Sequence, residues 1–245
     1  MVEYVAGEGG ASVQDLARRF NVSAATVRRD LTMLERAGRL IRTHGGAILS
    51  KPGVVEFAFV ERLDRHAEAK RAIGRKVAAM IEANSTLALD SGTTTLEVAK
   101  ALVGIPGLTV LTSSLAIASV LYAHDTVEMV LLGGTGRRGS PDLTGWLTEE
   151  NLKRFHVNYA IVGADGVTRE GAYTRAVDLA RICQCVLAAG ETSILVADHS
   201  KIGVPSFSRY AALSQFNHVV TDASVPAGAR RWLNRGAKNV VYARA

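Results

Sequence analysis

The segment that decides the fold of the N-terminal part is residues 20–47, FNVSAATVRRDLTMLERAGRLIRTHGGA. Its first residues predict a short turn, and Ser23 is the expected N-cap of a helix. Three apolar residues recur at i, i+4 and i+7, so we expect them on the buried face of this helix: Val27, Leu31 and Leu34. Gly38 predicts the end of the helix, because glycine is the usual residue just past a C-cap.

A shorter helix is predicted just before this segment. Ser12 is its expected N-cap, and Asp15 three residues later completes a capping box. Behind the longer helix, residues 39–43 and 48–49 predict two short strands around a Gly-Gly turn. Two helices joined by a tight turn and followed by a basic hairpin are the layout of a winged helix-turn-helix, whose second helix enters the major groove of DNA.

The exposed face of the second helix carries small residues and two arginines. An arginine can pair with a guanine or clamp a phosphate, and the basic residues of the hairpin are expected near backbone phosphates. The alternative is a small helical bundle with solvated arginines. We expect a surface for double-stranded DNA that consists of Ser23, Thr26, Arg28, Arg29, Arg39, Arg42 and His44.

Positive charge is concentrated around this segment of the 245-residue chain, whose formal net charge is +6. Residues 12–51 hold eight Lys or Arg against three acids, whereas residues 52–225 hold 16 basic and 18 acidic residues. This distribution indicates a polyanionic partner for the N-terminal part. Residues 226–245 hold five basic residues and no acid, which is either a rival patch or a solvated end.

The composition, 48% hydrophobic and 21% charged, is ordinary for a globular protein. The two cysteines, Cys183 and Cys185, point to different sides of a helix, so we expect neither a disulfide nor a metal site. Residues 101–123 form an uncharged run long enough to span a bilayer. Glycine, proline and hydroxyl residues interrupt this run, so we expect a cytoplasmic protein without a membrane segment or secretory signal.

The rest of the chain alternates between strand and helix patterns. Pro52-Gly53 marks a break, and residues 68–83 predict an amphipathic helix. Strands are expected at 86–90, 108–112, 127–132, 159–163, 193–197, 219–221 and 239–242, with helices at 96–102, 115–122, 145–155, 179–189 and near 232. Such alternation predicts an α/β fold with a mainly parallel sheet. The expected domains are a winged helix-turn-helix (1–50), a linker (51–66) and an α/β domain (67–245).

Ligands of parallel sheets bind where the carboxyl ends of the strands meet. Five expected strand ends are rich in Gly, Ser, Thr and Asp, and the last one adds a lysine. Backbone amides at the start of the helix after the first strand suit an anion. We therefore expect a pocket for a phosphorylated polyol formed by Asp90, Ser91, Gly92, Thr93, Thr94, Thr95, Ser113, Ser114, Gly133, Gly134, Asp165, Gly166 and Lys201. The alternatives are a capped helix without a ligand and a Lys201–Asp198 ion pair.

Residues 20–47 resemble the N-terminal signature of the DeoR family of bacterial transcriptional regulators. The strand ends DSGTTT (90–95), TSS (112–114) and ADHSK (197–201), with the glycines at 133–134 and 163–166, resemble the sensor domain of that family. The resemblance covers nearly the whole chain. It implies a repressor of carbohydrate catabolism genes that a phosphorylated sugar or related metabolite releases, with a sensor similar in fold to sugar-phosphate isomerases.

Two other interpretations stay open. Residues 134–139 form a G-x-G-x-x-G after a strand, which on spacing alone is a dinucleotide fingerprint. An isomerase-like enzyme with a basic arm would need a carboxylate base and a tuned partner, for which Asp90, Asp165 and Lys201 supply the residue types. We expect the regulator instead, with no catalytic residue, no cofactor and no metal, acting as a homo-oligomer (a dimer or tetramer) on paired half-sites.

Overall fold

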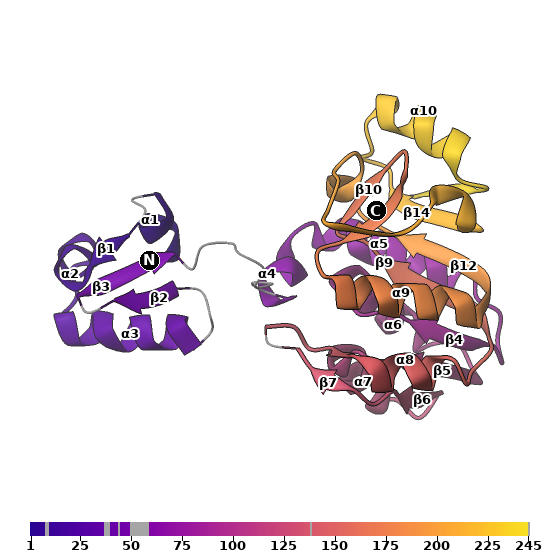
Figure 1. Cartoon of the computed structure of the whole chain (residues 1–245), viewed down its shortest axis with the longest axis horizontal. Coiled ribbons are helices and arrows are strands. Elements are labelled where there is room, and N and C mark those ends of the chain that lie inside the picture. The colour runs from indigo at the N-terminus through magenta and orange to yellow at the C-terminus, as the bar shows by residue number, and fades with distance from the viewer. Residues whose placement is uncertain (8–9, 37–39, 44, 50–58, 138, 245) are drawn as a thin grey trace. The chain divides into compact units, whose positions relative to one another are not determined.

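The computed structural model describes residues 1–7, 10–36, 40–43, 45–49, 59–137 and 139–244. The chain divides into two compact units, Met1–Ala58 and Phe59–Arg137 with Pro141–Ala245 (Figure 1). Each unit has its own hydrophobic core, as expected for separate domains. No helix among the described residues is long and apolar enough to cross a membrane.

The first unit packs three helices against a three-stranded antiparallel sheet of order β1-β3-β2. Its elements are α1 (Val2–Gly7), β1 (Ala11–Ser12), α2 (Val13–Phe20), α3 (Ala24–Arg36), β2 (Leu40–Thr43) and β3 (Gly46–Leu49). The predicted face of α3 is confirmed, since Val27 and Leu31 are fully buried and Leu34 packs against the same cluster. Helix α1 adds the fully buried Val5 to this cluster.

Local signals in the sequence explain where the two central helices begin. The Ser12 hydroxyl accepts the Asp15 backbone N–H at 3.1 Å, and the Ser23 hydroxyl accepts that of Thr26 at 3.1 Å. Helix α2 ends at Asn21, whose φ of 51° is left-handed. Both predicted N-caps are therefore confirmed, and a short turn separates α2 from α3.

The second unit is built on a seven-stranded, fully parallel sheet of order β15-β14-β12-β9-β4-β5-β6. Its strands are β4 (Thr86–Leu89), β5 (Leu108–Thr112), β6 (Val127–Leu131), β9 (Val157–Gly163), β12 (Gly190–Val196), β14 (His218–Asp222) and β15 (Val240–Ala243). Its helices are α4 (Phe59–Asp64), α5 (Ala67–Ala78), α6 (Thr93–Leu102), α7 (Leu115–Tyr122), α8 (Trp146–Leu152), α9 (Val177–Ala189) and α10 (Ala227–Gly236).

Alternating side chains on each strand feed two separate hydrophobic clusters. On β4, Leu87 and Leu89 belong to the cluster with α5, α6 and α7, whereas Ala88 belongs to the cluster with α9. This is the period of two that a strand imposes. Both faces of the sheet are covered by helices, as the uninterrupted apolar strand patterns predicted. The predicted α/β class and parallel sheet are confirmed.

Two features differ from the sequence prediction, and the dinucleotide alternative is excluded. Helix α4 lies within residues 51–66, where we expected only a linker, and belongs to the second unit. A small antiparallel sheet of β10 (Gly166–Thr168), β11 (Gly171–Thr174) and β13 (Ser208–Ala211) was not predicted. Residues 134–139 contain β7 (Thr135–Gly136), which pairs with β8 (Leu143–Thr144), so no helix follows this glycine pattern as a dinucleotide loop would need.

Helices α5 and α6 approach each other closely at Gly74. A Cβ placed there would lie 2.4 Å from the backbone oxygen of Glu97. Gly74→Ala should therefore lower the free energy of unfolding by about 1–3 kcal/mol, the usual cost of overpacking, although alanine favours helix. Both tryptophans, Trp146 and Trp232, lie in the second unit, so urea unfolding followed by tryptophan fluorescence reports on this unit.

Gly228 in α10 is the matched control, because a Cβ there meets nothing within 4 Å. Gly228→Ala should leave stability unchanged or raise it by up to about 1 kcal/mol through helix propensity. A Gly74→Ala protein as stable as the Gly228→Ala protein would contradict the close approach of α5 and α6.

Candidate functional site

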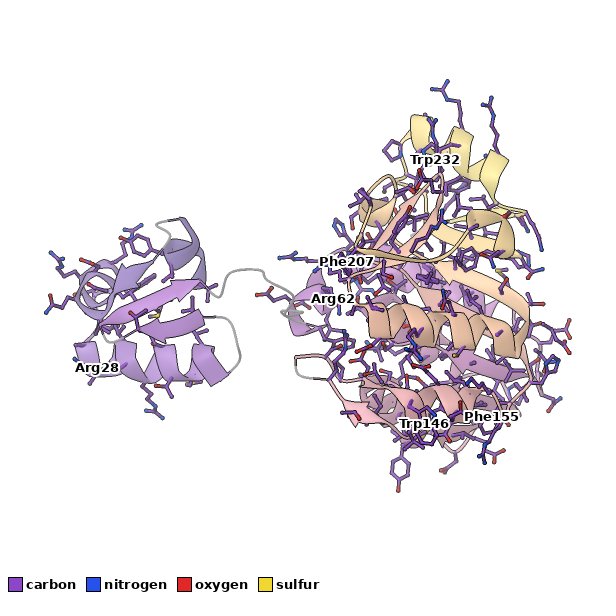
Figure 2. All side chains as sticks on the ribbon, in the orientation of Figure 1. Arg28, Arg62, Trp146, Phe155, Phe207 and Trp232 are labelled. Carbon is purple, nitrogen blue, oxygen red and sulfur yellow. The ribbon has the colours of Figure 1, made fainter. Side chains whose placement is uncertain are left out.

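The exposed face of α3 presents the residues that we expected to contact DNA. Ser23, Thr26, Arg28 and Arg29 are all exposed, opposite the buried Val27. Figure 2 marks the position of Arg28 on α3. The Ser23 and Thr26 hydroxyls lie 2.8 Å apart, so their side chains also serve the start of the helix. The surface therefore combines small polar groups with two cations on one rigid helix, as groove reading requires.

The hairpin part of this expected surface is described only in its backbone. Strand β2 contains Arg42 and pairs with β3 in antiparallel register, which is the expected wing. Gly46 allows β1 to approach this hairpin, because a Cβ there would lie 2.1 Å from the Ala11 oxygen. Arg39 and His44 lie outside the described residues, so their DNA contacts stay predictions.

Asp90 is the central group at the carboxyl edge of the parallel sheet. It follows β4, is 4% exposed and accepts the Gly163 N–H, at the end of β9, at 3.2 Å. Its other oxygen, Oδ1, has no hydrogen-bond partner in the described part of the chain. Burial, with a contribution from the nearby Asp142 charge, raises the pKa of Asp90 to about 7. Asp90 is thus a carboxyl that titrates near neutral pH.

Asp142 connects the loop after β4 to the hairpin after β6. This 1% exposed carboxylate pairs with Arg137, whose Nη2 lies 3.1 Å from Oδ2 and whose Nε lies 3.3 Å from Oδ1. The Ser91 hydroxyl donates to Oδ2 at 2.9 Å. Arg137, which the sequence pattern placed in a glycine-rich loop, is therefore held in a bidentate ion pair.

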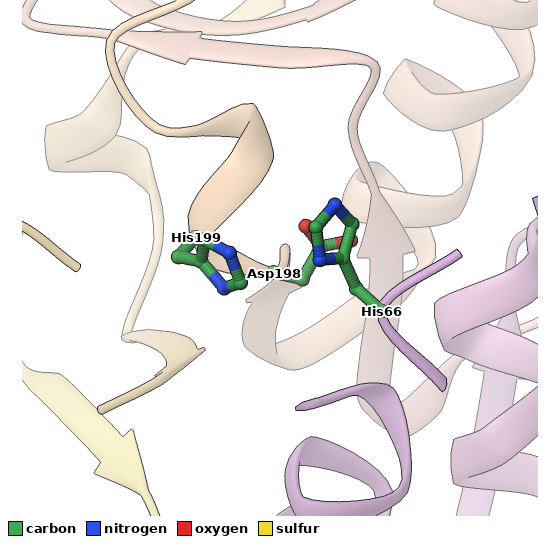
Figure 3. Close-up of side chains that lie close together, drawn as sticks. All are labelled: His66, Asp198 and His199. Atoms are coloured by element: carbon green, nitrogen blue, oxygen red, sulfur yellow. The ribbon is translucent and has the colours of Figure 1, made fainter. Parts of the chain in front are cut away.

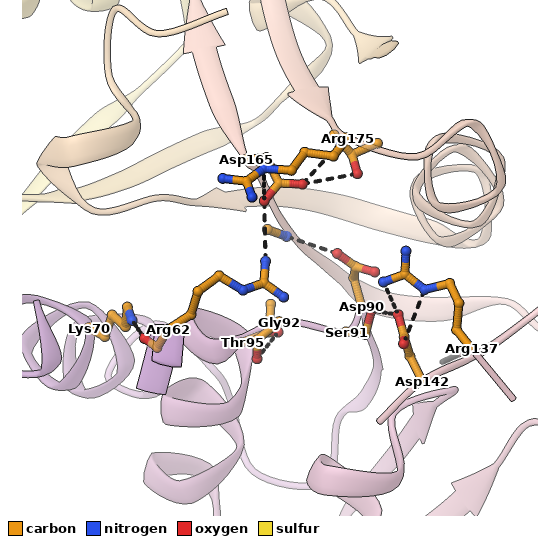
Figure 4. A network of polar contacts seen from close by, with 12 residues as sticks. Arg62, Lys70, Asp90, Ser91, Gly92, Thr95, Arg137, Asp142, Asp165 and Arg175 are labelled. Atoms are coloured by element: carbon orange, nitrogen blue, oxygen red, sulfur yellow. Dashed lines mark hydrogen bonds and ion pairs between the residues drawn. The ribbon is translucent and has the colours of Figure 1, made fainter. Parts of the chain in front are cut away.

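Asp165 fastens α4 to the loop after β9 (Figure 4). Arg62 Nη1, from α4, lies 3.2 Å from Asp165 Oδ1, and both side chains are largely buried. Oδ2 accepts the Thr174 hydroxyl at 3.2 Å and the Arg175 backbone N–H at 3.0 Å. The buried Lys70 donates in turn to the Arg62 carbonyl. This network joins residues that are 103 positions apart in sequence.

Lys201 adds a partly buried positive charge at the same edge. It lies in a short 3₁₀ helix (His199–Lys201) after β12. Burial lowers its pKa, while the Asp165 and Asp198 charges act in the opposite direction. Lys201 Nζ forms no hydrogen bond or ion pair with any described residue, and Asp198 Oδ1 accepts the Ser200 N–H instead. The alternative of a Lys201–Asp198 ion pair is therefore wrong.

The start of α6 offers backbone N–H groups beside these charges. Its N-cap is Gly92, which has no side chain to accept a hydrogen bond, and Thr95 Oγ1 donates to the Gly92 oxygen at 3.0 Å. Thr93 and Thr95 are buried and Thr94 is half-buried. A ten-residue helix with an uncapped N-terminus favours an anion through its free amides and its dipole.

Other expected site residues support the backbone around this edge. Ser114 caps α7 by accepting the Ile117 N–H at 3.3 Å, and the Ser113 carbonyl accepts the Leu143 N–H at 2.9 Å. The Gly133 carbonyl accepts the Thr148 hydroxyl at 2.7 Å. Gly134 and Gly166 allow close packing, since a Cβ would lie 2.1 Å from Thr148 Oγ1 and 2.2 Å from the Val204 oxygen, respectively. Their contact with a ligand stays a prediction.

The sequence interpretation missed three charged residues of this network, Arg62, Asp142 and Arg175, as site members. Arg62 lies in the expected linker, and Asp142 lies in a loop that follows no strong strand pattern. Their partners are fixed only by the tertiary fold, so spacing along the chain carried no signal for them.

The first unit is a helix-turn-helix domain, called the head below, and the second is a parallel α/β domain with a polar site at the strand ends. This combination defines a class, the DNA-binding transcriptional regulators that carry a second, sensing domain. Residues 1–52 match the DeoR-like helix-turn-helix domain, and residues 65–223 match the DeoR C terminal sensor domain. The chain belongs to the DeoR family of transcriptional regulators.

Similar proteins of known name are regulators of this kind. The chain is 31% identical over 227 residues to the glycerol-3-phosphate regulon repressor of Escherichia coli (strain K12), covering 92% of this chain and 90% of the relative. It is 31% identical over 222 residues to the HTH-type transcriptional repressor GlcR of Bacillus subtilis (strain 168), covering 91% and 86%. The L-fucose operon activator of Haemophilus influenzae (strain ATCC 51907 / DSM 11121 / KW20 / Rd) is also 31% identical over 227 residues, covering 92% and 91%.

Among solved structures, the chain is similar to ribose 5 phosphate isomerase A from Neisseria gonorrhoeae. The match has a TM-score of 0.41 and 20% identity, and covers 54% of this chain and 52% of that chain.

Asp90 should make the stability of the second unit depend on pH. Its pKa is about 7 when folded and 3.8 as the ordinary value, so between these pH values the folded state binds more protons than the unfolded state. The free energy of unfolding therefore falls as pH rises through this window. Asp90→Asn should remove this slope, which amounts to on the order of 4 kcal/mol at 1.36 kcal/mol per pKa unit.

Urea unfolding by tryptophan fluorescence at pH 5 and pH 8 measures this effect. The free energy of unfolding of Asp90→Asn, minus that of the original protein, should be larger at pH 8 than at pH 5. The same stability difference at both pH values would show that Asp90 does not titrate between them.

Proposed function

We propose that this regulator represses carbohydrate catabolism genes and that a phosphorylated sugar or related metabolite releases it from DNA. The observation that carries the proposal is the pairing of a DNA-reading head with an anion site at the sheet edge. In that site, the ammonium of Lys201, which pairs with no described residue, and the uncapped N-terminus of α6 lie at the carboxyl ends of parallel strands. The name of the E. coli relative, a glycerol-3-phosphate regulon repressor, supports a phosphorylated polyol as the effector class.

The polar network suggests how binding of a ligand could change the contacts of α4. Arg62 and Asp165 form an ion pair that ties α4 to the end of β9. A phosphate bound near Lys201 would compete with the Asp165 carboxylate for nearby cations, so bound and free states would hold α4 with different strength. A ligand shifts a conformational equilibrium only through such a difference in contacts. Since α4 is the first described element after the head, it is the natural place for the signal to leave the sensor domain.

The reading role of α3 is testable at Arg28. Arg28→Ala should weaken binding to a duplex selected for tight binding by about 1–3 kcal/mol if Arg28 pairs with a guanine. Binding to random duplex should fall much less. Fluorescence anisotropy with both duplexes at one fixed salt concentration measures the two losses.

Arg231→Ala is the control for charge alone, because Arg231 is an exposed arginine on α10 in the second unit. It should leave both affinities unchanged. An equal loss on selected and random DNA in Arg28→Ala would mean that Arg28 binds phosphate and does not read a base.

The sensing role of the sheet edge is testable at Lys201. Lys201→Gln removes a charge that pairs with no described residue, so it should abolish or weaken the thermal shift that phosphorylated sugars cause while operator binding persists. A charge-assisted hydrogen bond to phosphate contributes about 1.5–3 kcal/mol, which predicts roughly a ten- to hundredfold weaker effector affinity. A thermal-shift screen with glycerol phosphate and hexose and pentose phosphates provides the measurement.

Lys238→Gln removes the same charge from an exposed lysine before β15, at the opposite edge of the sheet. It should respond to sugar phosphates like the original protein. If Lys201→Gln responds equally well, the effector does not bind at Lys201. If a sugar phosphate binds but leaves operator affinity unchanged, the proposed release mechanism is wrong.

We also propose that the protein acts as a homo-oligomer, because paired half-sites require two heads. Large apolar side chains that are exposed on the second unit support this proposal. Trp146 and Leu147 at the start of α8 are 72% and 47% exposed, and Leu131 on the edge strand β6 is 42% exposed.

A further inference from the structure

Three side chains outside the Asp90–Asp142–Asp165 network converge on one point, His66, Asp198 and His199 (Figure 3). One potential ligand atom from each lies within 4.8 Å of those from the other two. His66 lies between α4 and α5, whereas Asp198 and His199 follow β12. Two imidazoles and one carboxylate form a donor set that binds Zn²⁺ and other divalent transition metals.

Asp198 supplies a second, independent observation, a buried polar atom without a partner among the described residues. Its side chain is 1% exposed, and its Oδ1 accepts the Ser200 N–H at 3.0 Å. Its Oδ2 is buried and has no hydrogen-bond partner among the residues described. Leaving a buried carboxylate oxygen without a partner is costly. A cation bound between Asp198 and the two histidines would remove this cost.

His199 is oriented in the way that metal-binding histidines usually are. Its Nδ1 lies 2.9 Å from Oδ2 of Asp222, which is 4% exposed at the end of β14. Asp222 Oδ1 also accepts the His199 backbone N–H at 2.6 Å. A carboxylate that accepts from one imidazole nitrogen leaves the other nitrogen free to bind a metal and fixes the ring position.

His66 is held in a backbone conformation that non-glycine residues seldom adopt. Its φ of 54° lies in the left-handed region at the N-cap of α5, where its side chain caps no backbone group. The His66 and His199 rings meet edge to face with centroids 4.7 Å apart. Strained residues of this kind cluster at ligand sites. Here the turn directs the His66 ring toward the other two donors.

The surroundings leave room for the remaining ligands of a metal. His66, His199 and Asp222 line an open cavity of about 350 Å³ together with residues from α5 and the end of β15. A three-ligand site keeps an open position for water or a substrate. In a tetrahedral zinc site, bond lengths of about 2.0–2.2 Å bring donors to about 3.4 Å from each other, so the donors, which lie within 4.8 Å of one another, would have to move closer together when a metal binds.

Two lysines, the buried Lys70 and the partly buried Lys201, are the competing partners for Asp198. Lys70 and Lys201 both interact electrostatically with its charge. However, neither forms an ion pair with Asp198, and Lys70 Nζ donates to the Arg62 carbonyl instead. The orphaned Asp198 oxygen is therefore available to a different cation.

We propose that His66, Asp198 and His199 bind one divalent transition-metal ion per chain, with Asp222 positioning His199 and with further coordination positions open to the adjacent cavity. The ion would connect the turn before α5 to the loop that carries Lys201. This site needs no assumption about the effector or the operator.

The test uses the full-length chain without a histidine tag, stripped of metal with a chelator and then dialysed. Zn²⁺ is titrated in competition with a chromophoric chelator, and Co²⁺ binding is followed by its visible absorption. We expect one ion per chain and a rise of the unfolding temperature with Zn²⁺. His66→Asn and His199→Gln should each weaken binding at least about tenfold, and Asp222→Asn about 10–100-fold. Asparagine is chosen at position 66 because it tolerates the left-handed conformation.

His124→Ala is the matched control, since His124 is exposed, lies after α7 and belongs to no metal-ligand group in the described part of the chain. Its affinity for Zn²⁺ should equal that of the original protein, and circular dichroism confirms that each variant is folded. The absence of stoichiometric binding to the original chain would overturn the proposal. Folded His66→Asn and His199→Gln proteins that bind Zn²⁺ as well as His124→Ala would overturn it as well.

Discussion

The parallel pairing of β4 with β9 at the centre of the sheet is the constraint on which the strand-end site depends. Leu89 lies opposite Ile161 in this register. Asp90, one residue after Leu89, and Gly163, two residues after Ile161, therefore meet at the carboxyl edge and form a partly buried hydrogen bond. Every other parallel strand ends at the same edge. Loops that are far apart in the chain therefore meet there, and the polar groups in them have to satisfy one another because helices cover both faces of the sheet.

Most charged side chains at this edge form ion pairs, and a few polar atoms have no partner among the described residues. Asp142 and Asp165 are each held by an arginine, and these pairs fix the loops without needing a ligand. Asp90 Oδ1 and Lys201 Nζ remain without partners in the part of the chain that the structure describes. A ligand that accepts from Lys201 and donates a hydroxyl to Asp90 would complete both. A sugar phosphate carries both kinds of group, which supports the proposed effector class.

Sequence periodicity predicted the buried strands well because burial on both faces leaves a continuous apolar signal. Strand β5 was predicted with its observed bounds, Leu108–Thr112. Strand β12 begins at Gly190, earlier than predicted, because Gly190 and Thr192 pair with Val157 and Tyr159 of β9 although they are not apolar. Helix α4 was missed because six residues show no full amphipathic period. Asp90, Asp165 and Lys201 were predicted from their position after strands, but Arg62 was not, since its partner lies 103 residues away.

Residues 62–66 connect the two proposed sites of the second unit. Arg62 pairs with Asp165 in the strand-end network, and four residues later His66 faces Asp198 and His199. The loop after β12 also carries one residue of each site, because His199 and Lys201 lie in the same short 3₁₀ helix. Because only three residues separate Arg62 from His66, the Arg62–Asp165 ion pair and a metal ion bound to His66 would both restrain this short segment. The turn between α4 and α5 is therefore the element whose conformation either ligand would bias, and its left-handed His66 already stores backbone strain that a change of state can release.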